Sequence, residues 1–116
     1  MSPKFEKSPP ELIARFEAVA ARHPVAAKRK MFGYPCLFVG GNLACGLFAD
    51  GWFVRLDDAG AADALALPGA TPFAPMPGRP MRGWVVLPAD LVADDAALDA
   101  WVGRATANAA AMPPKA

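Results

Sequence analysis

Residues 31–49 carry no charged side chain, and this stretch constrains the fold more than any other part of the sequence. Its short apolar runs are interrupted by Gly40-Gly41, and Asp50-Gly51 follows directly after it. Both dipeptides accept the positive φ angles that a two-residue hairpin turn requires. The glycines and Pro35 would break a long helix repeatedly, which argues against a membrane-spanning helix. The sequence therefore predicts a meander of three antiparallel strands that ends at Leu56.

The two turns also predict which residues face each other. Counting outward from each turn places Cys36 opposite Cys45 and Leu47 opposite Val54. Both faces of the meander are then apolar, although a sheet with one solvated face alternates more cleanly. Either another part of the chain or a partner is expected to cover the second face, and we favour self-association as a homodimer. The candidate self-association residues on that face are Leu37, Val39, Phe48 and Phe53.

The predicted register gives the two cysteines a possible redox role. At a non-hydrogen-bonded pair of an antiparallel ladder, Cys36 and Cys45 would have Cα atoms about 4.5 Å apart. A disulfide at that spacing would be strained and easily reduced. The expected state is two reduced thiols, because disulfides rarely persist in the cytoplasm. A redox pair is the alternative.

Three amphipathic segments predict helices. Ser8-Pro9-Pro10-Glu11 has the form of a capping box and opens a helix that stops before Pro24, with His23 beside its negative end. Asp57 or Asp58 can cap a second helix, which Pro68-Gly69 ends. Asp94 or Asp95 can cap the last one.

Two further segments are strand candidates. Residues 71–77 contain three prolines and can supply at most an edge strand. Residues 81–87 alternate Met81, Gly83, Val85 and Leu87 with Arg82, Trp84 and Val86.

These elements predict a two-layer α+β domain with helices on one face of an antiparallel sheet of four to five strands. The predicted order is α-β-β-β-α-β-β-α. The chain of 116 residues is expected to form one domain over 1–116, with flexible ends at 1–7 and 109–116. Hydrophobic residues make up 54% and charged residues 20%, which excludes wholesale disorder.

The net charge of +1 is unevenly placed, because residues 1–30 carry +4 and residues 31–116 carry −3. The first part contains the basic run Lys28-Arg29-Lys30. Together with Arg79 and Arg82 this run could contact nucleic acid, and that reading predicts one contiguous basic surface. We favour a solvated sheet edge instead, since charged edge strands discourage aggregation. Direct binding of nucleic acid is therefore not expected.

The sequence offers no catalytic or metal-binding pattern. His23 is the only histidine, and the serines are Ser2 and Ser8, at the terminus and in a cap. A zinc site of ordinary spacing and a serine nucleophile with its base are therefore not expected. No P-loop or G-x-G-x-x-G motif is present, so no cofactor is expected either. Without the apolar core of a signal peptide at the N-terminus, the predicted location is the cytoplasm.

Several motifs in order resemble the N-terminal domain of the TfoX/Sxy competence-regulator family. The resemblance covers most of the chain and implies an α+β domain of the predicted order. The motifs are Lys30-Met31-Phe32-Gly33, Leu37-Phe38-Val39-Gly40-Gly41-Asn42-Leu43, Gly51-Trp52-Phe53-Val54-Arg55-Leu56, Leu67-Pro68-Gly69-Ala70, Pro72-Phe73, Pro75-Met76-Pro77-Gly78-Arg79-Pro80-Met81-Arg82 and Val85-Val86-Leu87-Pro88.

The resemblance implies a role in regulation. Founding members of that family control DNA-uptake genes in bacteria together with a nucleotide-sensing transcription activator, and they carry a second, helical C-terminal domain. This sequence ends at Ala116, so we expect a stand-alone member without that domain. The expected function is a non-enzymatic regulatory or protein-interaction domain with a protein partner, such as a transcription regulator.

A rigid loop that carries arginine and apolar side chains suits protein contacts or an anion. The candidate interaction loop comprises Phe32, Gly33, Arg79, Met81 and Arg82. The structural alternative is that the glycines serve turns and the arginines pair with the Asp-rich helices. A small-ligand-binding domain or an uncharacterised enzyme, with a pocket between sheet and helices, is the alternative function.

Overall fold

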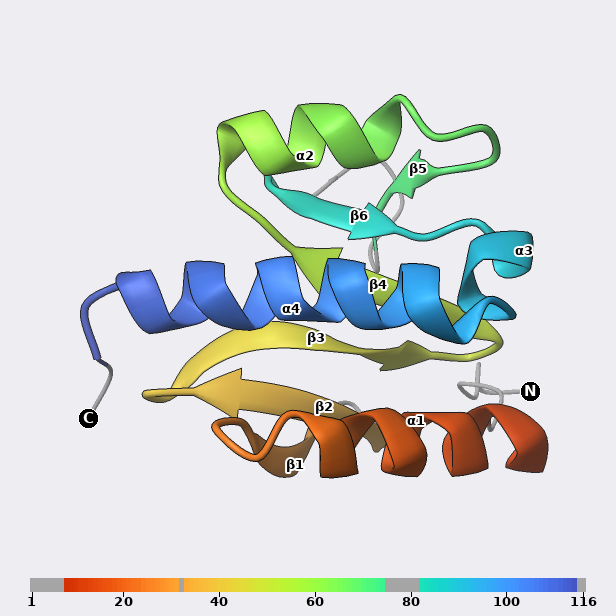
Figure 1. Cartoon of the computed structure of the whole chain (residues 1–116), viewed down its shortest axis with the longest axis horizontal. Coiled ribbons are helices and arrows are strands. Elements are labelled where there is room, and N and C mark those ends of the chain that lie inside the picture. Colours follow the sequence, from red (N-terminus) through yellow and green to blue (C-terminus); the bar gives the residue numbers. More distant parts are fainter. Residues whose placement is uncertain (1–7, 32, 75–81, 115–116) are drawn as a thin grey trace, which may run out of the picture.

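Within the described residues, the protein is organised by one antiparallel sheet of six strands, in the spatial order β1-β2-β3-β4-β6-β5 (Figure 1). The structure is a computed structural model and describes residues 8–31, 33–74 and 82–114. The strands are β1 (Ala27–Met31), β2 (Tyr34–Val39), β3 (Asn42–Phe48), β4 (Gly51–Arg55), β5 (Thr71–Pro72) and β6 (Trp84–Val86).

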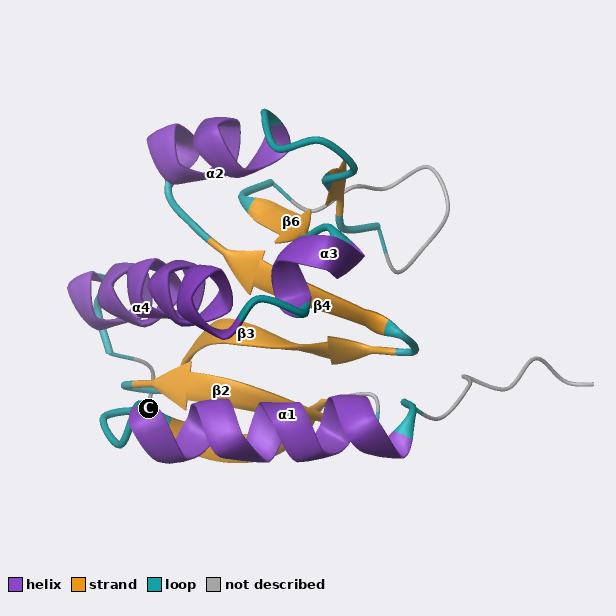
Figure 2. Ribbon diagram, turned by 45° about the vertical axis from the view of Figure 1, so that its right-hand side comes forward, coloured by secondary structure: helices purple, strands orange, loops and turns teal. Residues whose placement is uncertain are grey.

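The described helices pack against one face of this sheet (Figure 2), so the predicted two-layer α+β class is confirmed. They are α1 (Pro10–Arg22), α2 (Asp58–Leu65), α3 (Ala89–Val92) and α4 (Asp95–Ala111). The predicted count of four to five strands is too low, because the basic run belongs to the separate strand β1. Strand β5 is the short edge strand that its prolines allow. The turn of helix at α3 was not predicted.

Two of the predicted helix caps are confirmed. The Asp57 carboxylate accepts a hydrogen bond of 2.7 Å from the Gly60 amide, and the Asp94 carboxylate accepts one of 3.1 Å from the Ala97 amide. The predicted Ser8 cap is wrong. Its hydroxyl donates to the Ala49 carbonyl at 2.6 Å, so a tertiary contact takes the group away from the helix start.

The first predicted turn is confirmed, but the register beyond it is wrong. Gly40 and Gly41 have φ angles of 59° and 80°, and Phe38 faces Leu43 as expected. The next pairs join Leu37 to Cys45 and Cys36 to Gly46. The extra residue of β3, Ala44, forms a β-bulge that moves the following pairs by one position.

The second turn lies one residue earlier than predicted. Its two residues are Ala49 and Asp50, because Phe48 faces Gly51 and Leu47 faces Trp52. Ala49 has a φ angle of 53°, which is unusual for a residue other than glycine. The Ser8 hydroxyl on the Ala49 carbonyl helps to hold this conformation, a long-range contact that the local sequence does not reveal.

The main core lies between the sheet and the helices. Phe16 of α1 packs against Trp52 of β4 with ring centroids 5.1 Å apart. Side chains from four helices meet the helix-facing side of the sheet in one continuous cluster. Its fully buried members include Phe16, Val19, Leu37, Ala44, Cys45, Val54, Ala64, Leu98, Val102 and Ala105.

Candidate interaction surface and pocket

The other side of the sheet, here called the helix-free face, has its own apolar cluster. Its buried members are Cys36, Leu43, Phe53 and Phe73, and the partly buried residues packed around them are Met31, Phe38, Phe48, Trp84 and Val86. The described helices contribute no residue to this cluster. A solvated sheet face would carry alternating polar residues here, so the apolar composition requires an explanation.

Three aromatic rings form a stack at the centre of this face. The Phe53 ring lies 4.3 Å from that of Phe73 and 5.3 Å from that of Trp84, and all three are within 5° of parallel. The Arg55 guanidinium lies 5.9 Å from the Trp84 ring centroid, so a cation borders the stack. Phe53 and Phe73 are themselves buried, at 1% and 4% exposure, so Trp84 is the ring of the stack that is partly exposed to solvent.

The structure divides the four residues predicted to share a self-association face. Phe48 and Phe53 lie on the helix-free face, as predicted for that surface. Leu37 and Val39, however, lie in the helix-side core, with 0% and 7% exposure. The bulge at Ala44 is the physical reason, because a shift of one residue exchanges the faces of a strand relative to its neighbour.

Sequence reasoning missed Phe73 and Trp84 as members of the stack. The signal for Trp84 was present, since it alternates with Val85 and so points away from the helices. Phe73 gave no such signal, because it follows Pro72 at the end of a two-residue strand. Only the pairing of β5 with β6 brings it onto Phe53.

The predicted interaction loop is only partly described. Phe32, Arg79 and Met81 lie outside the described residues. Gly33 has a φ angle of 82° between β1 and β2, whereas Arg82 precedes β6, so β3 and β4 separate the two.

Arg82 forms an ion pair with an acidic residue of a helix, as the structural alternative for the arginines described. Its guanidinium donates to the Asp58 carboxylate at 2.6 Å on the surface of the molecule. This hydrogen bond, together with the charge of Arg82, lowers the pKa of the Asp58 carboxyl.

Lys28 and Arg82, two of the basic residues that the nucleic-acid reading would join in one surface, lie far apart in the sheet, and each pairs with an acidic side chain. Lys28 on β1 pairs with Glu17 of α1 at 2.5 Å. Arg82 lies toward the other edge of the sheet and pairs with Asp58. With strands about 4.8 Å apart, three intervening strands put some 20 Å between these positions.

The predicted position of Cys36 opposite Cys45 is wrong, because Cys36 faces Gly46 and Cys45 faces Leu37, whereas the expected state of two free thiols is the one that the structure has. Both thiols are free and buried, with Cys36 in the cluster of the helix-free face and Cys45 in the helix-side core. Burial raises the pKa of the Cys36 thiol to about 11, and burial likewise raises the pKa of Cys45. Because the side chains point to opposite faces of the sheet, no disulfide can join them without rearrangement.

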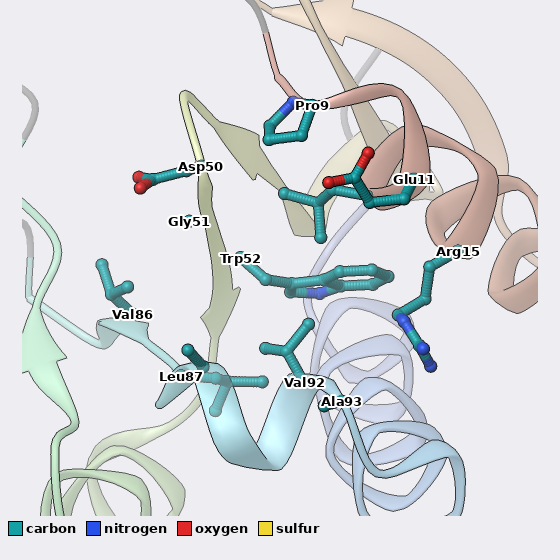
Figure 3. Close-up of a pocket in the computed structure, with 12 residues that line it drawn as sticks. Pro9, Glu11, Arg15, Asp50, Gly51, Trp52, Val86, Leu87, Val92 and Ala93 are labelled. Carbon is teal, nitrogen blue, oxygen red and sulfur yellow. The ribbon is translucent and has the colours of Figure 1, made fainter.

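A pocket of about 560 Å³ opens where three segments meet beside Trp52 (Figure 3). The start of α1, the turn into β4 and the connection from β6 through α3 supply its walls. The lining residues are Pro9, Glu11, Leu12, Arg15, Asp50, Gly51, Trp52, Val86, Leu87, Ala89, Val92 and Ala93. This volume is within the range of small-molecule sites.

The described residues contain neither a cluster of metal ligands nor a membrane-spanning helix. No group of three or more His, Cys, Asp or Glu side chains in ranges 8–31, 33–74 and 82–114 could hold a metal ion. Over the same ranges, no helix is long and apolar enough to cross a membrane.

The fold and the aromatic helix-free face define an α+β domain with one helical layer. A family model described as the TfoX N-terminal domain matches residues 12–109. The chain therefore belongs to the TfoX N-terminal domain family, as its motifs indicated. Comparisons with curated proteins and with solved structures gave no match.

Proposed function

We propose that this protein is a non-enzymatic interaction domain that self-associates through its helix-free face. The observation that carries the proposal is a group of partly exposed apolar side chains, Phe38, Phe48, Trp84 and Val86, on a sheet face to which the described helices add no residue. Large apolar side chains concentrated on one side of a domain favour burial against a partner surface. A regulatory role through protein contacts is also what membership of this family favours.

A second copy of the chain is the favoured first partner. Phe38, Phe48, Trp84 and Val86 are only partly buried, so an identical face would find apolar side chains to cover. A two-fold axis lets the same patch serve both copies. The net charge of +1 adds little repulsion between the copies.

Light scattering after gel filtration tests this proposal with matched variants. Phe38→Glu and Trp84→Glu place a charge on the helix-free face, and both side chains are exposed enough for a replacement to reach solvent. Val25→Glu is the control, because Val25 is 66% exposed and lies outside that face. The Phe53→Arg change is unsuitable, since Phe53 is 1% exposed and a buried arginine would unfold the domain.

The proposal expects a wild-type dimer that persists in Val25→Glu and dissociates in both face variants. Circular dichroism confirms that the variants remain folded. A folded wild-type monomer, or a dimer that survives both face substitutions, would overturn self-association through this face.

A further inference from the structure

We propose that the outer edge of β1 binds an extended acidic segment of a protein partner, which joins the sheet as an added strand. This inference is independent of the proposed self-association. It concerns backbone groups at the edge of the sheet, whereas self-association concerns apolar side chains on the helix-free face.

Strand β1 is an open edge in the described part of the chain. It stands at one end of the strand order and pairs with β2 (Figure 1). Residues 27–30 are all exposed, so no described helix or loop covers the strand. An open edge strand presents unpaired backbone N–H and C=O groups. Such groups can accept another extended chain by strand addition.

A proline opposite β1 determines which backbone groups point outward. Lys30 faces Pro35, which has no N–H, so these two residues cannot exchange a pair of hydrogen bonds. Bonded and non-bonded pairs alternate along an antiparallel ladder, so Arg29 is in a bonded pair and Lys28 is not. The N–H and C=O groups of Lys28 and Lys30 are therefore directed away from β2. Their spacing of two residues is the one that an added strand requires.

The side chains of β1 favour a partner of negative charge. Lys28 already forms an ion pair with Glu17 of α1, on the helix side of the sheet. Arg29 and Lys30 form no ion pair with the described residues. Neighbouring residues of a strand point to opposite faces, so one of these two cations stands on each side of the edge.

This charge pattern separates the possible occupants of the edge. A second copy of β1 would place its own basic run against the first, and like charges on adjacent strands are destabilising. An added strand with two successive carboxylates would instead meet Arg29 on one face and Lys30 on the other. Met31, which packs against the cluster of the helix-free face, would meet an apolar residue next to those carboxylates.

Four probes test the backbone pairing and the charge separately. They are the end-capped peptide Thr-Val-Glu-Glu-Val-Thr, the same peptide methylated on its four central backbone nitrogens, Thr-Val-Lys-Lys-Val-Thr, and a short oligothymidylate. Each is titrated into the isotopically labelled full chain while the amide resonances of Lys28 and Lys30 are followed by NMR. We expect a saturable shift with the acidic peptide at a dissociation constant of about 100 μM, and binding at least about tenfold weaker for the other three.

Variants locate the site on β1. Arg29→Gln and Lys30→Gln should each weaken binding of the acidic peptide about threefold, as expected for exposed ion pairs. Arg82→Gln is the matched control and should change nothing, because this exposed arginine lies toward the other edge of the sheet. Lys30→Pro removes an outward N–H at a position where an edge strand tolerates proline, and should abolish binding while circular dichroism stays unchanged. Trp84→Glu should bind like the wild type, which separates this site from the self-association face.

The outcomes that would overturn the proposal differ in what they exclude. Equal binding of the methylated peptide would show attraction by charge without strand pairing. Equal binding of the lysine peptide or of the oligothymidylate would exclude selection of an acidic peptide. Absence of a saturable shift at Lys28 and Lys30 with the acidic peptide would overturn the site itself.

Discussion

The Asn42 side-chain amide donates a hydrogen bond to the Pro113 carbonyl at 2.9 Å, across 71 positions of the sequence. It also lies 3.5 Å from the Ala109 carbonyl, so it satisfies backbone groups at the end of α4. Asn42 is 1% exposed and follows the Gly40-Gly41 turn. This contact fastens the last helix to the β2–β3 hairpin.

Replacing Asn42 should measure how much this fastening contributes. We expect Asn42→Ala to lower the free energy of unfolding by about 1–3 kcal/mol, because the Ala109 and Pro113 carbonyls lose the donor that the buried Asn42 amide supplies. Urea denaturation with circular dichroism gives the value. Asn108→Ala is the comparison, since its bond to the Arg55 carbonyl is longer, at 3.4 Å, and should cost less. Equal losses in the two variants would contradict a special role for Asn42.

Gly46 should not tolerate a side chain. A Cβ atom there would lie 2.4 Å from the Cys36 sulfur and 3.1 Å from the Phe53 ring. We expect Gly46→Ala to destabilise the domain by about 1–3 kcal/mol through overpacking. Gly103→Ala in α4 serves as the opposite case. A Cβ atom there would meet only a His23 ring atom, at an ordinary contact distance of 3.9 Å, and alanine stabilises a helix relative to glycine by about 0.5–1 kcal/mol. Thermal unfolding midpoints should move in opposite directions, and a shared direction would refute the packing around Gly46.

Acid should weaken the contact between α1 and α4. Burial alone would raise the pKa of Asp99, but hydrogen bonds from His23 and Arg22 outweigh it and lower that pKa below 3.8. A carboxyl whose pKa is lower in the folded state adds stability above its unfolded pKa and loses that contribution as pH falls through the folded value.

The variant Asp99→Asn should therefore be less stable than wild type at pH 7, by up to about 1 kcal/mol for such a partly exposed group. The difference should shrink below pH 4. Urea midpoints between pH 2 and pH 7 provide the test. Asp90→Asn, at an exposed position of α3, should track the wild type throughout. A difference for Asp99→Asn that stays constant with pH would rule out this linkage.

The buried thiols should react slowly in the native protein. With the pKa of Cys36 near 11 rather than 9.0, its thiolate population at pH 8 is reduced about 100-fold, and burial limits access further. Iodoacetamide should therefore label neither cysteine until urea unfolds the chain, as followed by mass spectrometry. Rapid native labelling, or an intramolecular disulfide after mild oxidation, would contradict the opposite-face placement of Cys36 and Cys45.

The sequence predicted the order of most elements because local signals determined them. The Gly40-Gly41 turn, the Asp57 and Asp94 caps and the proline-limited β5 all depend on neighbouring residues. The register failed where a distant contact decided the geometry, as with Ser8 on the Ala49 carbonyl.

The bulge at Ala44 had the larger consequence for the candidate surface. It moved Leu37 and Val39 into the core and separated the two cysteines. Side chains alternate between the two faces of a strand, so one extra residue in β3 exchanges the faces predicted for the residues beyond it. The apolar character of the second sheet face was correctly predicted, because composition does not depend on register. The Trp52 pocket could not be located from sequence, since its walls come from three segments that only tertiary packing brings together.

Sedimentation equilibrium of the wild-type chain over a concentration series is the decisive measurement for the helix-free face. Self-association predicts a mass that rises with concentration from that of one chain, 12.1 kDa, toward twice that value. The matched Trp84→Glu series should remain at the mass of one chain while Val25→Glu follows the wild type. A wild-type mass that stays at one chain up to about 1 mM would contradict self-association.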